Sequence, residues 1–272
     1  MRRCAVLGDP IDHSLSPVLH RAAYGATGLD WVYDARRVPA GGLAGFVADL
    51  DDDWRGLSLT MPLKREVLGL PGLAEVADWA RLAGAANTLV RTDRGWVADN
   101  TDVPGAVSAV RERSDGAFVA ATVLGGGATA ASTALALCEL GVGSITLLVR
   151  SPDRAAETLE AIDRHPARPG VRVGLLARDE VVGDVVVSTI PADAQDESVL
   201  RRCRVVPLVF EVLYDPWPTP LAAQARETGQ VLVGGLDLLV HQAALQFSAF
   251  TGLDAPLDAM RAAGEAALGG RA

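Results

Sequence analysis

A single lysine, Lys64, ends the segment GLSLTMPLK in a chain of 272 residues. Lysine and arginine together number 25, so every other basic side chain apart from histidine is an arginine. A lysine ammonium readily gives up its proton when it is partly buried, whereas an arginine guanidinium stays protonated. The retained lysine therefore indicates proton transfer, and the alternative is one lysine left by chance in an arginine-rich composition.

Polar residues that can act with Lys64 follow other strand-like runs. Pro62 turns the chain out of a predicted strand, so we expect Thr60 and Lys64 at its carboxyl end, where open α/β sheets bind ligands. Asn87 and the run 100–102 are expected at further strand ends. An aspartate beside Lys64 would hold the ammonium charged while a carbonyl oxygen takes its proton. The alternative for residues 100–102 is a helix N-cap, and both roles can coexist.

A glycine-rich turn, VLGGGATAAS, follows a predicted buried strand at 117–124 and opens a helix that ends at Gly141. Gly125 permits a tight turn, Gly127 lets the backbone approach a pyrophosphate, and the small Ala130 lets helix and strand pack closely. This context favours a dinucleotide whose diphosphate lies over the helix N-terminus. An ordinary glycine-rich turn is the alternative.

The next predicted strand, 144–150, ends without the acidic residue that binds the ribose of NAD. Arg150 ends it, with Ser151 and Arg154 close behind. Two guanidiniums and a hydroxyl favour the 2′-phosphate of NADP through charge-assisted hydrogen bonds. Asp153 is open to two interpretations, a ribose ligand or the start of the next helix. The arginines are alternatively a solvated surface.

Short apolar runs and helical patterns alternate through the first hundred residues, which predicts βαβ units and a mostly parallel sheet. A helix is expected at 16–28, with Pro17 in its first turn and Gly28 as its C-cap. The predicted strands span residues 4–8, 31–38, 54–60 and 86–91.

A second series of strands begins at the glycine-rich turn, and two helices follow from Leu236 to the end. Helices that end a doubly wound domain often pack on the earlier half. We therefore expect an α/β protein with a discontinuous substrate domain (1–103 and 236–272), a Rossmann-like doubly wound domain (104–235) and a cleft between them. The predicted strands of the second domain span residues 117–124, 144–150, 171–176, 184–189, 205–210 and 230–235.

Composition excludes several other classes of function. A net charge of −9 argues against a nucleic-acid partner, since such proteins concentrate basic residues. Cys4, Cys138 and Cys203 are widely spaced, and the four histidines lack ligand spacing, so we expect neither disulfides nor a metal. No apolar stretch approaches the ~20 residues of a membrane span. These features predict a cytoplasmic protein.

The chain resembles the shikimate dehydrogenase family. The resemblance covers nearly the whole chain in the family's order and spacing, and no one stretch carries it alone. It implies reversible, NADP-dependent reduction of 3-dehydroshikimate to shikimate in aromatic amino-acid biosynthesis, by a monomer or homodimer. The stretches that carry it are GDPIDHSLSPVLH, SLTMPLK, AGAANTLV, ADNTDVPG, VLGGGATAAS, VRSPDR, EVLYDPWPTPL and GGLDLLVHQAALQF.

The resemblance also implies roles for individual residues. Lys64 and Asp102 correspond to the catalytic pair. The implied substrate ligands are Ser14, Ser16, Thr60, Asn87, Tyr214 and Gln242. The implied NADP-binding residues are Gly125, Gly126, Gly127, Ala128, Arg150, Ser151, Arg154, Thr189, Ile190, Leu213 and Gly235.

The chain departs from the family pattern in four places. They are Ser58 for the usual Asn, Ala128 and Thr129 for Gly and Ala, Val149 for the Asn before the arginine, and STIPAD for Asn-Ala-Thr-Ser. None of them alters Lys64 or Asp102. Quinate or an aminoshikimate as the substrate is one alternative function. A non-catalytic dinucleotide-binding regulator is another, although a regulator would not need the Lys64–Asp102 pair.

Overall fold

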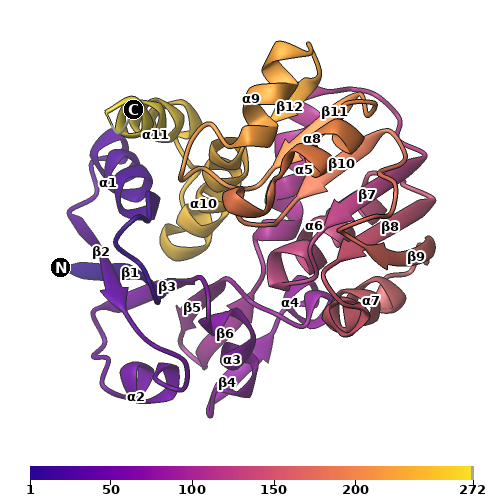
Figure 1. Cartoon of the computed structure of the whole chain (residues 1–272). Coiled ribbons are helices and arrows are strands. Elements are labelled where there is room, and N and C mark those ends of the chain that lie inside the picture. The colour runs from indigo at the N-terminus through magenta and orange to yellow at the C-terminus, as the bar shows by residue number, and fades with distance from the viewer. Residues whose placement is uncertain (271–272) are drawn as a thin grey trace. The chain divides into compact units, whose positions relative to one another are not determined.

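The computed structural model describes residues 1–270, which form two compact units (Figure 1). The first unit combines residues 1–101 with the described residues from Leu239 onward, and the second is Asp102–Leu238. The chain therefore leaves the first unit once and returns to it within one long helix, α10 (Gly235–Thr251). The roles predicted for the two parts of the chain stay predictions.

The first unit contains a six-stranded sheet in the order β2-β1-β3-β5-β6-β4. Three of its five strand pairings are parallel, and the two pairings that involve β5 are antiparallel. The predicted mostly parallel sheet is therefore confirmed. Its strands are β1 (Arg2–Gly8), β2 (Trp31–Arg37), β3 (Trp54–Leu59), β4 (Leu73–Val76), β5 (Thr88–Thr92) and β6 (Gly95–Asp99).

The reversal of β5 decides which residues share an edge of this sheet. Thr88, the first residue of β5, pairs with Ser58 near the end of β3 and with Asp99 at the end of β6. The start of β5 therefore lies at the same edge as the carboxyl ends of β3 and β6. Asn87 and Thr101, which flank β5 and β6, are brought to that edge together.

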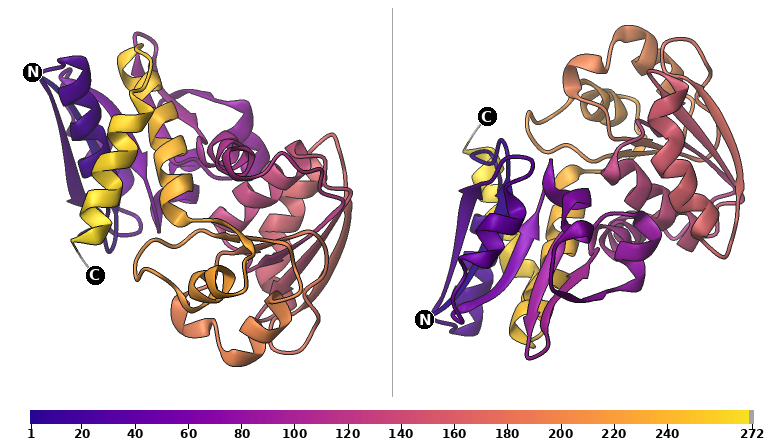
Figure 2. Two further views of the ribbon diagram at one scale, coloured as in Figure 1. Left: turned by 90° about the horizontal axis from the view of Figure 1, so that it is seen from above. Right: turned by 90° about the horizontal axis from the view of Figure 1, so that it is seen from below.

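Helices of the first unit come from both ends of the chain. Helix α1 starts with Pro17 in its first turn and ends at Gly28, which has φ 71°, as predicted. It lies beside α11, as the views in Figures 1 and 2 agree. The other helices are α2 (Leu43–Ala48), α3 (Leu63–Glu66), η1 (Val67–Gly69) and α4 (Asp78–Ala83), while α1 spans Ser16–Thr27 and α11 spans Leu257–Gly269.

The second unit contains an all-parallel sheet in the order β12-β11-β10-β7-β8-β9. The chain starts in the middle at β7, moves outward to β9, and then continues on the other side from β10. This is the doubly wound order that was predicted, with its switch point between β7 and β10. The strands are β7 (Ala120–Leu124), β8 (Ser144–Val149), β9 (Gly170–Leu175), β10 (Val185–Ser188), β11 (Leu208–Glu211) and β12 (Val231–Val233).

Buried apolar residues hold each sheet against its helices. Leu7, Leu57 and Leu89 belong to the core of the first unit, and Leu124 and Val209 to that of the second. The alanine-rich helix α6 lies beside α5 and α7 (Figure 1). The helices of the second unit are α5 (Asp102–Arg113), α6 (Ala128–Glu139), η2 (Pro152–Ala155), α7 (Ala156–Arg164), η3 (Ala192–Ala194), α8 (Glu197–Cys203) and α9 (Pro220–Glu227).

Some kinds of feature are missing from the described part of the chain. None of the helices in residues 1–270 is long and apolar enough to cross a membrane. Across the same residues, no three His, Cys, Asp or Glu side chains gather as a metal site would require. The three cysteines are buried as free thiols.

His20 on α1 is fully buried against aromatic rings. Its ring stacks on Tyr33 at 4.1 Å between centroids and lies 5.9 Å from the ring of Phe250. Within residues 1–270, neither ring nitrogen has a hydrogen-bond partner. Burial lowers the pKa of His20 to about 3, and the nearby Gln246 offsets only part of this effect. Folding therefore keeps the imidazole neutral.

This burial predicts a loss of stability in acid that His20→Phe should reduce. The unfolded chain takes up a proton below pH ~6.5 and the folded chain only near pH 3, so folding loses free energy as the pH falls between these values. Between pH 7 and pH 5, the free energy of unfolding of the wild type should fall by about 2 kcal/mol more than that of His20→Phe. Urea denaturation at both pH values measures this difference.

Equal pH dependence of the wild type and His20→Phe would contradict the neutral, buried state of His20.

Candidate active site

The backbone around Lys64 is held from two sides. Leu63 is fully buried, and the Lys64 carbonyl accepts a hydrogen bond from the Ala86 N–H at 2.7 Å. The Glu66 carboxylate accepts hydrogen bonds from two N–H groups at the start of α2, among them that of Leu43 at 3.0 Å. The Lys64 side chain is half-buried. The short helix α3 therefore presents the lysine from a fixed position, directly after β3.

Asn87 is the centre of a buried amide network at the same edge of the sheet. Its side chain is 2% exposed, and its Nδ2 donates to Thr101 Oγ1 at 2.9 Å and to Gln242 Oε1 at 3.2 Å. Its Oδ1 accepts from the Thr101 N–H at 2.8 Å. Gln242 comes from α10, so the helix that returns to the first unit completes the network. The structure thus brings together Asn87 and Gln242, two of the predicted substrate ligands.

Gln246, which the sequence reasoning did not single out, extends this network. Its Nε2 donates to the Asn87 carbonyl at 3.0 Å and to Thr88 Oγ1 at 2.9 Å. Its Oε1 accepts from Ser58 at 2.6 Å, and Ser58 in turn accepts from the Tyr33 hydroxyl at 2.6 Å. The sequence spacing could have indicated this residue, because Gln242 and Gln246 are four residues apart and therefore share one face of a helix. Ser58, a departure from the family pattern, is a buried member of this network.

The predicted hydroxyl ligands lie at the same edge, after β1 and β3. The Ser16 N–H donates to Ser14 Oγ at 3.3 Å where α1 begins, and the Ser16 side chain lies next to the Tyr33 hydroxyl. Thr60 follows β3 directly, and its methyl group lies so close to Gly8 that a Cβ there would overlap it. Of the three hydroxyls, those of Ser14 and Thr60 are partly exposed, while Ser16 is buried.

Asp102 and Tyr214 belong to the second unit. Asp102 is the first residue of α5 and is 5% exposed, and a carboxylate in the first turn suits the positive end of a helix dipole. This place agrees with the helix N-terminal role considered for residues 100–102, and a chemical role of Asp102 stays a prediction. Tyr214 is half-buried in the segment after β11. The pairing of Asp102 with Lys64 stays a prediction.

The predicted glycine turn lies at the switch point of the second sheet. Gly125 has φ 111°, and a Cβ on it would overlap the Thr189 hydroxyl. Thr189 follows β10, and its Oγ1 donates to the Leu124 carbonyl at 2.8 Å. Ile190, the next predicted cofactor residue, is buried. The carboxyl ends of β7 and β10 therefore meet where doubly wound sheets bind dinucleotides.

The segment of arginines is packed against the glycine turn. A Cβ on Gly126 would overlap the carbonyl of Arg154, so the backbones of the two segments touch. Gly127 has open space around it and lies at the N-terminus of α6, where free N–H groups attract anions. Arg150, Ser151 and Arg154 are exposed, and within residues 1–270 neither guanidinium has an ion-pair partner.

Leu213 and Gly235, the remaining predicted cofactor residues, contact each other. A Cβ on Gly235 would overlap the carbonyl group of Leu213, so only glycine fits at this position. Gly235 is the first residue of α10, and Leu213 follows β11. The start of α10 is therefore set by the segment that carries Leu213 and Tyr214.

Two family models match the chain. The model described as "Shikimate dehydrogenase substrate binding domain" matches residues 6–89. The model described as "Shikimate 5'-dehydrogenase C-terminal domain" matches residues 235–263. Lys64 and Asn87 fall within the first match, and Gln242 and Gln246 within the second.

Known proteins resemble the chain over nearly its full length. The shikimate dehydrogenase (NADP(+)) of Moorella thermoacetica is 36% identical over 94% of this chain and 90% of its own. The crystal structure of Mycobacterium tuberculosis shikimate dehydrogenase has a TM-score of 0.86 and 40% identity, over 98% of this chain and 100% of that one. The Thermus thermophilus enzyme, solved in complex with NADP(H) and shikimate, has a TM-score of 0.82 and 30% identity over 98% and 100%.

Proposed function

The chain belongs to the shikimate dehydrogenase family, and from this premise we propose that it reversibly reduces 3-dehydroshikimate to shikimate with NADPH. The observation that carries the proposal is the shared edge of the first sheet. The chain's single lysine follows β3 there, beside the start of β5, where the amides of Asn87 and Gln242 are fixed in one network. A proton donor and oriented polar groups are what a polyhydroxylated carbonyl substrate requires.

Neutral side chains hold the substrate. Shikimate and 3-dehydroshikimate carry several oxygens on a small ring, and hydroxyl and amide groups orient such a ring without adding charge. Asn87 and Gln242 are held in place by Thr101 and Gln246, so their orientation is set before the substrate arrives. Ser14, Ser16 and Thr60 supply hydroxyls from the neighbouring strand ends, and Tyr214 closes the site.

The glycine turn and the arginine segment hold NADP. The residues fit this cofactor, because the turn leaves open space at Gly127, the Arg154 backbone lies against Gly126, and the Arg150 and Arg154 side chains are exposed. Gly125–Ala128 would hold the diphosphate, and Arg150, Ser151 and Arg154 would hold the 2′-phosphate. Thr189, Ile190, Leu213 and Gly235 would lie toward the nicotinamide. When bound, NADPH supplies the hydride.

Lys64 supplies the proton. When the substrate carbonyl is reduced, its oxygen would need a proton, and the Lys64 ammonium would give it one. The resulting amine then takes a proton from water, and the reverse reaction uses the same groups in the opposite order. Asp102 would orient the ammonium before transfer. An arginine in this place could offer charge but no proton.

The remaining assignments follow from this function. The reaction belongs to aromatic amino-acid biosynthesis in the cytoplasm, and the protein acts on a small molecule as a monomer or homodimer. Quinate or an aminoshikimate are the sister substrates to test, because the same hydroxyl and amide groups would hold them.

Substitution of Lys64 tests the catalytic role directly. Lys64→Arg keeps the positive charge but removes the transferable proton, so kcat should fall by about 10²- to 10⁴-fold. The Kd for NADP should change little, because Lys64 lies outside the glycine turn. Stopped-flow absorbance of NADPH, together with titration of bound cofactor, separates the two quantities.

The reverse exchange Arg81→Lys, at an exposed surface ion pair, serves as the control and should leave kcat unchanged. Turnover by Lys64→Arg at the wild-type rate would rule out Lys64 as the acid.

Removal of Arg150 and Arg154 tests the choice of cofactor. The double variant Arg150→Ala/Arg154→Ala should bind NADP about 10²- to 10⁴-fold more weakly, since it loses two charge-assisted hydrogen bonds that contribute about 1.5–3 kcal/mol each. Its affinity for NAD should stay the same, because NAD lacks the 2′-phosphate. Isothermal titration calorimetry with both cofactors measures the ratio.

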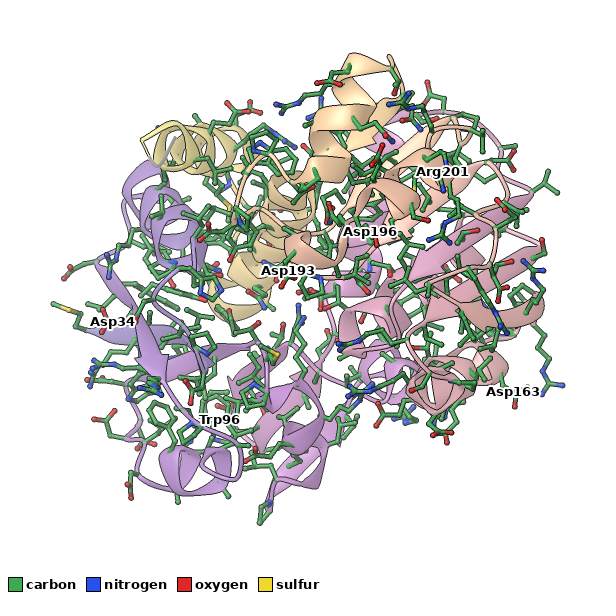
Figure 3. The ribbon with its side chains drawn as sticks, viewed as in Figure 1. Asp34, Trp96, Asp163, Asp193, Asp196 and Arg201 are labelled. Atoms are coloured by element: carbon green, nitrogen blue, oxygen red, sulfur yellow. The ribbon has the colours of Figure 1, made fainter. Side chains whose placement is uncertain are left out.

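Arg201 on α8, labelled in Figure 3, offers a matched exposed arginine. Arg201→Ala should bind both cofactors as the wild type does. An equal loss of NAD and NADP binding in the double variant would assign the arginines a structural role instead.

A further inference from the structure

A buried carboxylate, Glu211, ends β11 directly before the segment that carries Leu213 and Tyr214. We call residues 212–219 the strap. Glu211 is fully buried, and within residues 1–270 it has no ion-pair partner. Buried carboxylates without a cation are costly unless hydrogen bonds compensate them. No step of the proposed reaction uses this residue, so its place in the fold requires another explanation.

Both ends of the strap bind to this carboxylate. Its Oε1 accepts a hydrogen bond from the Leu213 N–H at 3.1 Å, and its Oε2 accepts from Thr219 Oγ1 at 3.0 Å. Thr219 Oγ1 also accepts from the Ala222 N–H at 3.1 Å and thereby caps α9. One side chain therefore closes the strap into a loop, because residues 213 and 219 each bind one oxygen of the same carboxylate.

Gln195 ties this loop to the neighbouring strand end. Its Nε2 donates to Glu211 Oε2 at 2.6 Å and to Ser188 Oγ at 3.3 Å, and its Oε1 accepts from the Leu221 N–H at 3.0 Å. Ser188 pairs with Glu211 across β10 and β11. Gln195 precedes Asp196, the N-cap of α8, which is labelled in Figure 3. The Glu211 carboxylate thus joins the ends of two strands, the strap and the start of α9.

The opposite side of the strap packs closely against the start of α10. The Leu213 carbonyl lies against Gly235, and the Trp217 ring lies 3.1 Å from where a Cβ of Gly234 would be. Arg226 of α9 lies over the same ring, with its guanidinium carbon 5.3 Å from the centroid. The strap is consequently held between Glu211 on one side and the start of α10 on the other.

We propose that Glu211 is a positioning residue. Its carboxylate fixes the strap so that Leu213 and Tyr214 are held in the geometry that binds cofactor and substrate, and proton uptake by the carboxylate loosens that geometry. The inference rests on the proposed function, because Leu213 and Tyr214 act only if NADP and the substrate bind here.

The surroundings of Glu211 make this proton uptake accessible near neutral pH. Burial raises the pKa of Glu211 to about 7, and the donors from Leu213, Thr219 and Gln195 only partly oppose the shift. Among the described residues, the Cys203 thiol of α8 is a titratable group that faces it, and burial raises the pKa of this thiol to about 12, so it stays neutral. Above pH ~7 the carboxylate accepts all three hydrogen bonds. Below that pH one of its oxygens becomes a donor.

The test compares NADP binding by the wild type and Glu211→Gln from pH 6 to pH 8.5. Glutamine keeps the size of the side chain but, like the protonated acid, replaces one acceptor oxygen with a donor. At pH 8.5 the variant should have a Kd about tenfold higher, the loss expected for one hydrogen bond to a charged group. This ratio should shrink toward one at pH 6. Because the 2′-phosphate itself titrates near pH ~6, the ratio and not either Kd is the readout.

Glu227→Gln, the same exchange at an exposed position at the end of α9, is the matched control and should follow the wild type at every pH. A ratio that does not change with pH would overturn the inference and leave Glu211 as a structural residue. If the wild type itself binds no NADP, the proposed function fails instead, so the two failures are distinct.

A measurement on the wild type alone keeps the proposal testable if Glu211→Gln does not fold. Hydrogen exchange of residues 212–219, followed by mass spectrometry and corrected for the intrinsic rate, should show less protection at pH 6 than at pH 8.5. Equal protection at both pH values would overturn the proposal.

Discussion

The antiparallel direction of β5 is the constraint on which the candidate active site depends. In a sheet whose other strands run one way, β5 brings its first residue, and Asn87 before it, to the edge where β3 and β6 end. Asn87 is buried there, so each of its polar groups must find a partner. Thr101, Gln242 and Gln246 supply those partners and fix the amide. Lys64 follows β3 at the same edge and so stands beside a rigid polar surface.

The need of buried polar groups for hydrogen-bond partners also explains why the chain returns to the first unit. Gln242 and Gln246 both lie on α10, and without them the Asn87 and Ser58 side chains would lose hydrogen bonds inside the protein. An unpaired buried polar group costs about 1–3 kcal/mol. In the second unit Glu211 has a comparable role, since its carboxylate collects donors from the strap, α9 and Gln195. A buried side chain that makes several hydrogen bonds thus fixes the backbone at each predicted binding surface, Asn87 in the first unit and Glu211 in the second.

Much of the fold and the family followed from local patterns, while pairing direction and buried polar contacts did not. Apolar runs located β1, β2, β3 and all strands of the second unit, and the Gly125–Ala130 turn located the switch point. The short edge strand β4 was missed because its residues are partly or fully exposed and give no apolar run. The reversal of β5 was missed because a strand's direction depends on distant partners. Gln246 and Glu211 were missed because a polar residue in a sequence does not reveal its burial, which tertiary packing decides.

The most direct test of the account is steady-state nicotinamide absorbance with the purified protein, using NADP or NAD with shikimate or quinate in all four combinations. The account predicts fast turnover with shikimate and NADP, and a much lower kcat/KM in the other three. Preference for quinate or for NAD would keep the lysine chemistry but contradict the assigned substrate or the role of Arg150 and Arg154. Absence of turnover in all four, with NADP still bound, would contradict the central claim that Lys64 serves a dehydrogenase.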